Sequence, residues 1–166
     1  SAWLGAGITG LVILLAILAP WICPYEVNER DAPFLKPSLQ HWLGTDSNEY
    51  DVLTRTLHGA RLSLIAGGLS VILAVVVGAS AGAVAGYLGG WVDALIMRSI
   101  EVLLAFPAIL IALLALVAMR PGWPAVICAV ALINVPLFAR QVRASVLSLR
   151  EQEYVMAAIA LGADSW

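Results

Sequence analysis

Four long apolar stretches dominate the chain, and most polar residues lie between or after them. The stretches run from about residue 2 to 23, 62 to 88, 102 to 119 and 123 to 139. A transmembrane helix needs about 20 predominantly apolar residues. The third stretch has a helical lead-in from Trp91, and the fourth is short and interrupted by Asn134 and Pro136. The pattern predicts an all-α, polytopic transmembrane protein with four spans.

The polar segments divide the chain into parts. We expect a first transmembrane helix (1–23), a loop with a short helix (24–61), a core of three spans (62–139) and a polar-to-amphipathic tail (140–166). The loop helix is predicted to begin at Asp46, which can cap it, with Glu49 completing a box-like arrangement and Asp51 pairing with Arg55. The turn "MRPGWP" (119–124) separates the third and fourth spans.

Composition supports placement in the lipid bilayer. Apolar residues make up 61% of the chain and charged residues 12%, with a mean hydropathy of +0.93. Soluble domains average about 45–50% apolar residues and about 25% charged residues. A net charge of −2 provides no basic field for nucleic acid. The residues "APWIC" place Trp21 and Ile22 where a signal-peptide cleavage site needs small side chains, so a retained span is favoured. Because Ser1 rather than Met begins the sequence, we expect a fragment.

Groups suited to catalysis or metal binding are scarce. The predicted spans contain no histidine and no acid near their middle, and ionisable groups at that depth are the usual marks of function. Arg98 and Glu101 fit a helix-surface ion pair. The "DSNEYD" stretch from Asp46 lacks the glycine and final glutamate of a calcium loop. His41 and His58 are expected to be isolated loop or surface residues, and Cys23 and Cys128 packing residues. We predict no catalytic residue and no metal site.

Two groups of residues are candidates for packing or transport. Gly78, Gly82 and Gly86 recur four apart, which lets another helix approach closely, either inside the subunit or at a subunit interface. The second group consists of residues that interrupt the third and fourth spans: Pro107, Asn134 and Pro136. They are either kink residues or the edge of a translocation pathway.

The tail holds an apolar helix too short to span. Ser148 and Glu151 fit a capping box that would begin it, and Val155, Ala158, Ile159 and Gly162 form one stripe. A membrane-surface helix should carry flanking bases and bulky apolar residues. This segment has no base between 151 and 164, so docking in a protein cleft is favoured.

Three stretches resemble a known family. "EYVMAAIALGA" resembles the EAA motif in the cytoplasmic loop of ABC-importer permeases, with Met156 at the glutamate position, followed by Ala157, Ala158 and Gly162. "HWLGTDSNEYDVLTRTLHGARLSL" and "GYLGGWVDALIMR" resemble the dipeptide/oligopeptide/nickel subgroup. Glu49 and Tyr50 stand where that subgroup usually has Gly-Arg.

The resemblance implies a fold and a set of partners. The fold would be the MetI-like permease fold of about six spans, four of them visible, in the bacterial inner membrane. A homologous second permease, two ATPase subunits and an extracytoplasmic binding protein would complete the importer. The binding protein would deliver substrate near the 24–61 loop outside. Peptides are the first expectation for that substrate, with nickel, opines or glutathione-like molecules as alternatives. This chain would bind lipid but no cofactor, with ATP and Mg on the ATPases.

The resemblance also implies a role for the tail, which would be cytoplasmic. The helix at 151–162 would dock in a cleft of an ATPase subunit, and ATP-driven closure would move it. The coupling residues would be those of the motif and those just before it: Glu153, Tyr154, Val155, Met156, Ala157, Ala158 and Gly162.

Two other classes of function remain as alternatives. A secondary transporter or channel fragment should show ionisable or coordinating groups in mid-membrane. A membrane assembly scaffold would use the Gly78/Gly82/Gly86 face for association. Dependence of uptake on ATP, and co-purification with an ATPase, would separate these from an ABC importer.

Overall fold

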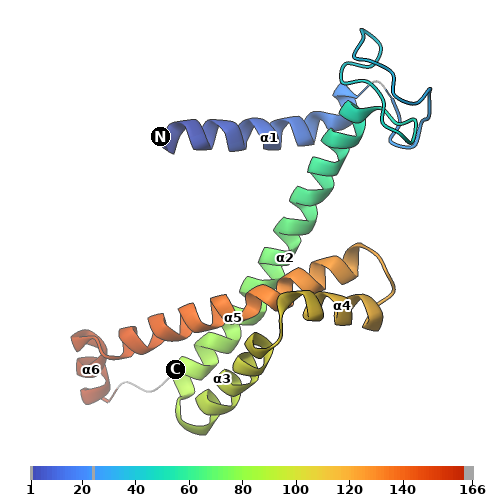
Figure 1. The fold of residues 1–166 in the computed structure, drawn as a ribbon. Coiled ribbons are helices and arrows are strands. Elements are labelled where there is room, and N and C mark those ends of the chain that lie inside the picture. The colour runs from blue at the N-terminus through green and yellow to red at the C-terminus, as the bar shows by residue number, and fades with distance from the viewer. Residues whose placement is uncertain (1, 24, 163–166) are drawn as a thin grey trace. The chain divides into compact units, whose positions relative to one another are not determined.

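The computed structural model describes residues 2–23 and 25–162, and within them the chain forms α-helices and no strand. The helices are α1 (Ala2–Ile22), α2 (Val52–Leu88), α3 (Gly90–Ala105), α4 (Ala108–Ala118), α5 (Trp123–Arg150) and α6 (Glu153–Ala160), as Figure 1 shows. The chain separates into two compact units, residues 1–65 and 66–166, and α2 runs through the boundary. The all-α fold is confirmed.

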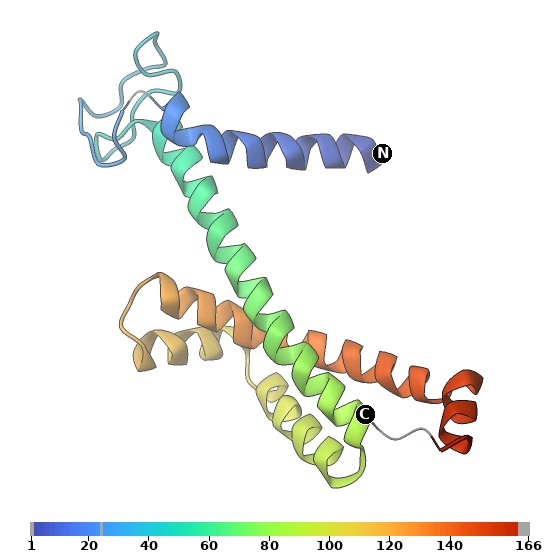
Figure 2. The same ribbon diagram turned by 180° about the vertical axis from the view of Figure 1, so that it is seen from behind.

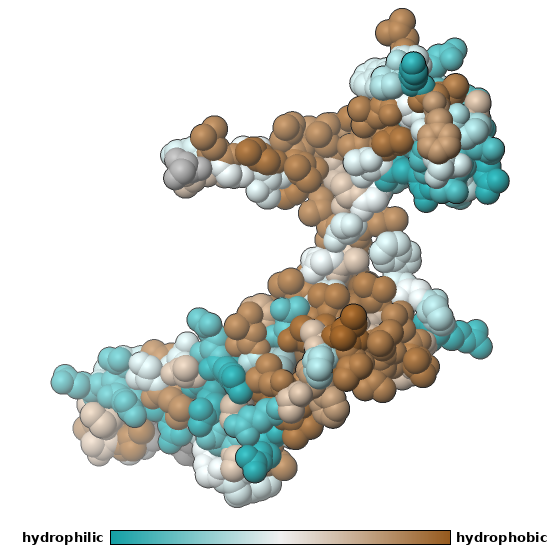
Figure 3. Space-filling model, viewed as in Figure 1, coloured by the Kyte–Doolittle hydropathy of each residue, from teal (hydrophilic) through white to brown (hydrophobic). Residues whose placement is uncertain are grey.

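Among the residues that the structure describes, three helices are long and apolar enough to cross a membrane: α1, α2 and α5. A fourth candidate span is the pair α3 and α4, which is bent by 96° at its break. Most large apolar side chains of α1 are exposed, and Figure 3 shows hydrophobic side chains along most of this helix. Exposed apolar surface on a helix of this length is what lipid contact requires.

The helix predicted from Asp46 instead begins at Val52 and continues to Leu88. Asp46 Oδ1 accepts hydrogen bonds from the backbone N–H groups of Asn48 and Tyr50, which closes a turn rather than a helix. Asp51 is the residue that caps the helix, since its Oδ2 accepts the Thr54 N–H at 2.8 Å. Arg55 therefore pairs with Asp46, at 3.4 Å, and not with Asp51 as predicted.

The predicted third span is two helices. Phe106 adopts an extended backbone (φ −88°, ψ 135°) between α3 and α4. The ring of Pro107 disfavours helical geometry in the residue before it. The predicted interruption of this span at Pro107 is confirmed.

The predicted interruption of the fourth span at Asn134 and Pro136 is wrong. α5 is continuous for 28 residues and includes Pro136. A proline removes one backbone donor. Packing on both sides of it offsets that loss, because Val135 belongs to a buried cluster with Ala74 of α2 and Ala139 is fully buried. In Figures 1 and 2, α5 crosses the second half of α2.

The helix start predicted at Ser148 is also wrong. Ser148 lies inside α5, and the short helix α6 follows a break at Glu151 and Gln152. Gln152 is the N-cap residue of α6 but makes no side-chain capping bond. The final residues of the predicted tail, 163–166, lie outside the described part of the chain.

Candidate functional site

The three glycines of α2 face α5. A Cβ on Gly78 would lie 2.7 Å from the Val135 carbonyl oxygen, and one on Gly82 would overlap the Ala139 carbonyl group. A Cβ on Gly86 would lie 3.0 Å from the Val146 Cβ atom. Ala74 and Ala85 are also fully buried. The small residues therefore permit close backbone approach between α2 and α5, which is the internal-packing alternative.

An ion pair joins α3 to α5 next to this contact. Arg143 donates from Nε to Oδ1 of Asp93 at 2.5 Å and from Nη2 to Oδ2 at 2.6 Å. Such bidentate pairing is stronger and more directional than a single contact. Both side chains are partly shielded, at 33% and 20% exposed. The partners are 50 positions apart in the sequence, which explains why the sequence pattern did not reveal this pair.

A second arginine of α5 binds the end of α2. Arg150 Nη1 donates to the carbonyl oxygens of Gly86 and Tyr87 at 3.1 and 3.0 Å. The last carbonyls of a helix lack intrahelical partners, and a cation there also favours the helix dipole. Arg143 and Arg150 together hold the last part of α5 against α3 and α2, immediately before α6.

The predicted coupling residues lie on an exposed helix. Only Val155 of α6 is partly shielded, whereas Met156 and Ile159 are 54% and 64% exposed. Gly162 has φ +84°, and its N–H donates to the Ile159 carbonyl at 3.0 Å. That left-handed conformation suits glycine and ends the helix. α6 thus presents apolar side chains that nothing within the described residues covers.

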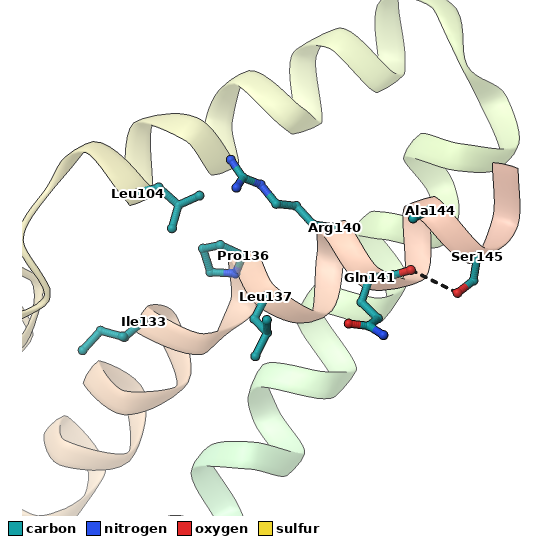
Figure 4. A pocket seen from close by; sticks show the side chains of 8 residues that line it. All are labelled: Leu104, Ile133, Pro136, Leu137, Arg140, Gln141, Ala144 and Ser145. Carbon is teal, nitrogen blue, oxygen red and sulfur yellow. Dashed lines mark hydrogen bonds between the residues drawn. The ribbon is translucent and has the colours of Figure 1, made fainter. Parts of the chain in front are cut away.

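The three pathway candidates do not form one site. Pro107 is exposed at the α3–α4 break, and the Asn134 Nδ2 atom donates to the Val130 carbonyl of its own helix at 2.7 Å. Pro136 is buried and lines a groove between α3 and α5, shown in Figure 4. The predicted surface ion pair of Arg98 and Glu101 is confirmed, at 3.3 Å.

His41 is not an isolated loop residue, so that prediction is wrong. It is 3% exposed, and its ring stacks on Tyr25 with centroids 4.7 Å apart. Nδ1 lies 3.0 Å from Asp51 Oδ1, and Nε2 lies 3.1 Å from Asp31 Oδ2. Each carboxylate is ten residues away along the chain, a separation that matches no local motif. His58 lies in α2, where its Nδ1 is 3.1 Å from the Thr54 carbonyl oxygen.

The two carboxylates favour the protonated imidazole. Both ring nitrogens face acceptors, and only the imidazolium can donate from both. The hydrogen bond to Asp51 raises the pKa of His41 despite its burial. The hydrogen bond from His41 lowers the pKa of Asp31. Burial alone would raise the pKa of Asp51, but hydrogen bonds from the Thr54 N–H and from His41 outweigh it and the pKa falls.

The described residues contain no cluster of side chains suited to metal binding. No group of three or more His, Cys, Asp or Glu side chains suited to a metal ion occurs in the part of the chain that the structure describes. The acidic side chains around His41 and at Asp93 are instead engaged in ion pairs, with His41 and with Arg143.

Two known protein families match this chain, one over each end. The family described as binding-protein-dependent transport system inner membrane component matches residues 74–166. The N-terminal TM domain of oligopeptide transport permease C matches residues 1–40.

Individual relatives align over nearly the whole chain. A glutathione transport system permease protein GsiD from Shigella flexneri serotype 5b is 48% identical over 157 residues, covering 93% of this chain and 52% of the relative. A dipeptide transport system permease protein DppC from Alkalihalophilus pseudofirmus is 42% identical over 162 residues, covering 93% and 53%. The chain spans about half the length of these curated relatives.

Proposed function

Because the chain belongs to the family of binding-protein-dependent transport system inner membrane components, we propose that it is part of the permease subunit of an ATP-driven importer. Its helices would line part of the substrate pathway. ATP hydrolysis would occur on two partner ATPase subunits, with this chain contributing no catalytic group. A homologous second permease would complete the membrane portion.

The observation that carries this proposal is the exposed helix α6. It follows directly on the long helix α5, yet none of its residues is buried within the described chain. An apolar helix of this length is marginal in water unless another surface covers it. A cleft on an ATPase subunit would provide that cover.

The contacts of α5 suggest how motion of α6 would reach the spans. Arg143 holds Asp93 of α3, and Arg150 holds the final carbonyls of α2. Displacement of α6 by closing ATPases would therefore pull on α3 and α2 through the same end of α5. Opening and closing of the pathway would follow from that movement.

Peptides are the substrate class that we propose. The relatives named above are a glutathione and a dipeptide transport permease, and glutathione is itself a small peptide. An extracytoplasmic binding protein would deliver the substrate near the loop at residues 25–51. Because this loop is held by hydrogen bonds around His41 and Asp51, it would offer that protein an ordered surface.

The test is the variant Ala158→Arg in the full-length permease, assembled with its partners in vesicles. Ala158 lies on the apolar stripe, and an unpaired charge in an apolar cleft is strongly unfavourable. We expect peptide uptake to fall by roughly tenfold or more. Uptake and ATP hydrolysis are measured on the same vesicles, with membrane insertion checked by carbonate extraction.

Ala160→Arg is the matched control. Ala160 lies on the same helix, about 140° around its axis from Val155, about 160° from Ala158 and Gly162, and about 100° from Ile159. It should insert and transport nearly as the parent does. Equal uptake by the two variants would contradict docking of α6 through its stripe.

A further inference from the structure

A groove runs between the last turns of α3 and the middle of α5. Its volume is about 560 Å³. One end is apolar and is lined by Leu104, Ile133 and Leu137. The other end carries polar side chains, those of Arg140, Gln141 and Ser145. Figure 4 shows the side chains of Leu104 and Arg140 on the same side of α5 as the end of α3.

Arg140 differs from the other arginines at this end of α5. Arg143 pairs with Asp93, and Arg150 binds two carbonyl groups. Arg140 has neither an ion pair nor a hydrogen bond within residues 2–23 and 25–162. The Ser145 hydroxyl donates to the Gln141 carbonyl at 3.1 Å, so the Gln141 side-chain amide is not used by that bond. Figure 4 shows the Gln141 amide on the other side of α5 from the Arg140 guanidinium, so Arg140 is the cation that the lining of the groove offers near α3.

The depth of Arg140 in the bilayer follows from α5. Residues 123–139 precede it and are almost entirely apolar. At 1.5 Å per residue, this part of the helix is about 25 Å long, slightly less than the roughly 30 Å hydrocarbon core. Arg140 therefore lies where the acyl chains give way to headgroups. Figure 3 shows the same change from hydrophobic to hydrophilic residues along α5.

We propose that the groove binds one anionic phospholipid. Its phosphate would lie against the Arg140 guanidinium, and one acyl chain would follow Leu104 and Pro136 on the same side of α5. Arginine suits phosphate because its planar N–H groups match two oxygens at once. A zwitterionic headgroup would bring its own cation toward Arg140, so an anionic one is favoured. The proposal requires membrane insertion only and does not depend on the direction or energy source of transport.

Native mass spectrometry of the full-length permease, paired with its homologous subunit, tests the proposal. The complex is titrated with phosphatidylglycerol and, separately, with phosphatidylcholine of the same acyl chains. We expect the parent to retain phosphatidylglycerol preferentially and Arg140→Gln to bind it about fivefold more weakly, the worth of one basic residue at an anionic headgroup. Arg140→Lys should keep most of the binding.

Two further variants separate this groove from general surface charge. Arg120→Gln removes another arginine that has no ion pair within the described residues, at the opposite end of α5 and outside the groove. It should retain the lipid as the parent does. Leu104→Trp, at a half-exposed position, should fill the groove and lower lipid retention without removing any charge.

Three results would overturn the proposal. One is equal retention of phosphatidylglycerol by the parent and by both Arg140→Gln and Leu104→Trp. Another is equal retention of the two lipids by the parent. The third is displacement of the lipid by a soluble dipeptide or inorganic phosphate, which would make the groove a site for a soluble anion. None of these results would bear on whether α6 docks on an ATPase.

Discussion

His41 illustrates how much a single side chain can organise in this protein. Its ring lies between two carboxylates, one ten residues before it and one ten residues after it, and stacks on Tyr25. Other charged groups line the same small cavity: Glu29, Arg30 and Glu49. Asp51 also caps α2 through the Thr54 N–H. The protonation state of His41 is therefore linked to the order of the loop and to the start of a membrane-length helix.

The stability of the loop should depend on pH in two directions. The raised pKa of His41 means that its contribution is fully present below its unfolded pKa of about 6.5 and is lost as pH rises through the folded value. The pKa values of Asp31 and Asp51 are lowered in the folded protein. The stability that these two carboxylates contribute is therefore present above about pH 4 and is lost as pH falls through their folded pKa values. We expect the loop to be most stable between these limits.

An NMR titration of the histidine ring resonances in the full-length subunit would measure this. His41 should titrate above an unstructured histidine peptide measured in the same buffer, and His41→Gln should abolish the loss of loop order at high pH. A His41 resonance that titrates below the peptide value would contradict the prediction.

At the scale of elements, the contact between α2 and α5 depends on the absence of side-chain volume. Gly82 is buried where the two backbones approach most closely, and its small neighbours Ala74 and Ala85 extend the same face. Helices in lipid gain no hydrophobic free energy by associating. Close van der Waals packing therefore has to supply much of the free energy of association. The spacing of the glycines predicts such a face, but only the folded structure identifies α5 as the helix that packs on it.

Gly82→Ala should weaken this contact. The added Cβ would overlap the Ala139 carbonyl group, and backbone atoms cannot turn away as a flexible side chain can. We expect a loss of about 1–3 kcal/mol in the free energy of unfolding, typical of overpacking. Thermal unfolding of the purified full-length subunit in detergent would measure it.

Gly67→Ala provides the control on the same helix. A Cβ at Gly67 meets nothing within 4 Å, so alanine should be neutral or raise stability by about 0.5–1 kcal/mol through helix propensity. If Gly82→Ala proved as stable as Gly67→Ala, the close approach of α2 and α5 would not be limiting.

At the scale of the whole molecule, the α3–α4 pair decides the topology. The 96° bend at Pro107 is compatible with a broken span or with a re-entrant segment. A broken span would return α6 to the same side of the membrane as the α2–α3 turn. A re-entrant segment would leave α6 on the side of the loop, whereas the bonds from Arg150 to the Gly86 and Tyr87 carbonyls hold the end of α5 at the end of α2 that leads into the α2–α3 turn. Coupling to cytoplasmic ATPases requires the first arrangement.

Labelling with a membrane-impermeant maleimide separates these topologies. In a variant with Cys23 and Cys128 replaced by alanine, Asn48→Cys should react in intact cells, because the proposed function requires the loop to face outside. Gln152→Cys should react only after the cells are permeabilised. Reaction of Gln152→Cys in intact cells would place α6 outside and exclude its role in coupling.

The membrane class, the helical fold, the break at Pro107 and the exposed apolar helix near the C-terminal end were all predictable from the sequence. Each follows from local rules: the length of an apolar run, the geometry before a proline, and the periodicity of a short helix. Within the candidate site, these rules identified the three glycines of α2 and the stripe of α6.

Only the tertiary structure decided the pairings. It moved the start of α2 to Val52, because Asp51 rather than Asp46 caps it. It carried α5 through Pro136, buried His41 between two acids, and joined Arg143 to Asp93. The Asp51 cap is a local contact with Thr54, but the burial of His41 and the Arg143–Asp93 pair depend on residues that are far apart in the chain and meet only when it folds, so no local pattern encodes them.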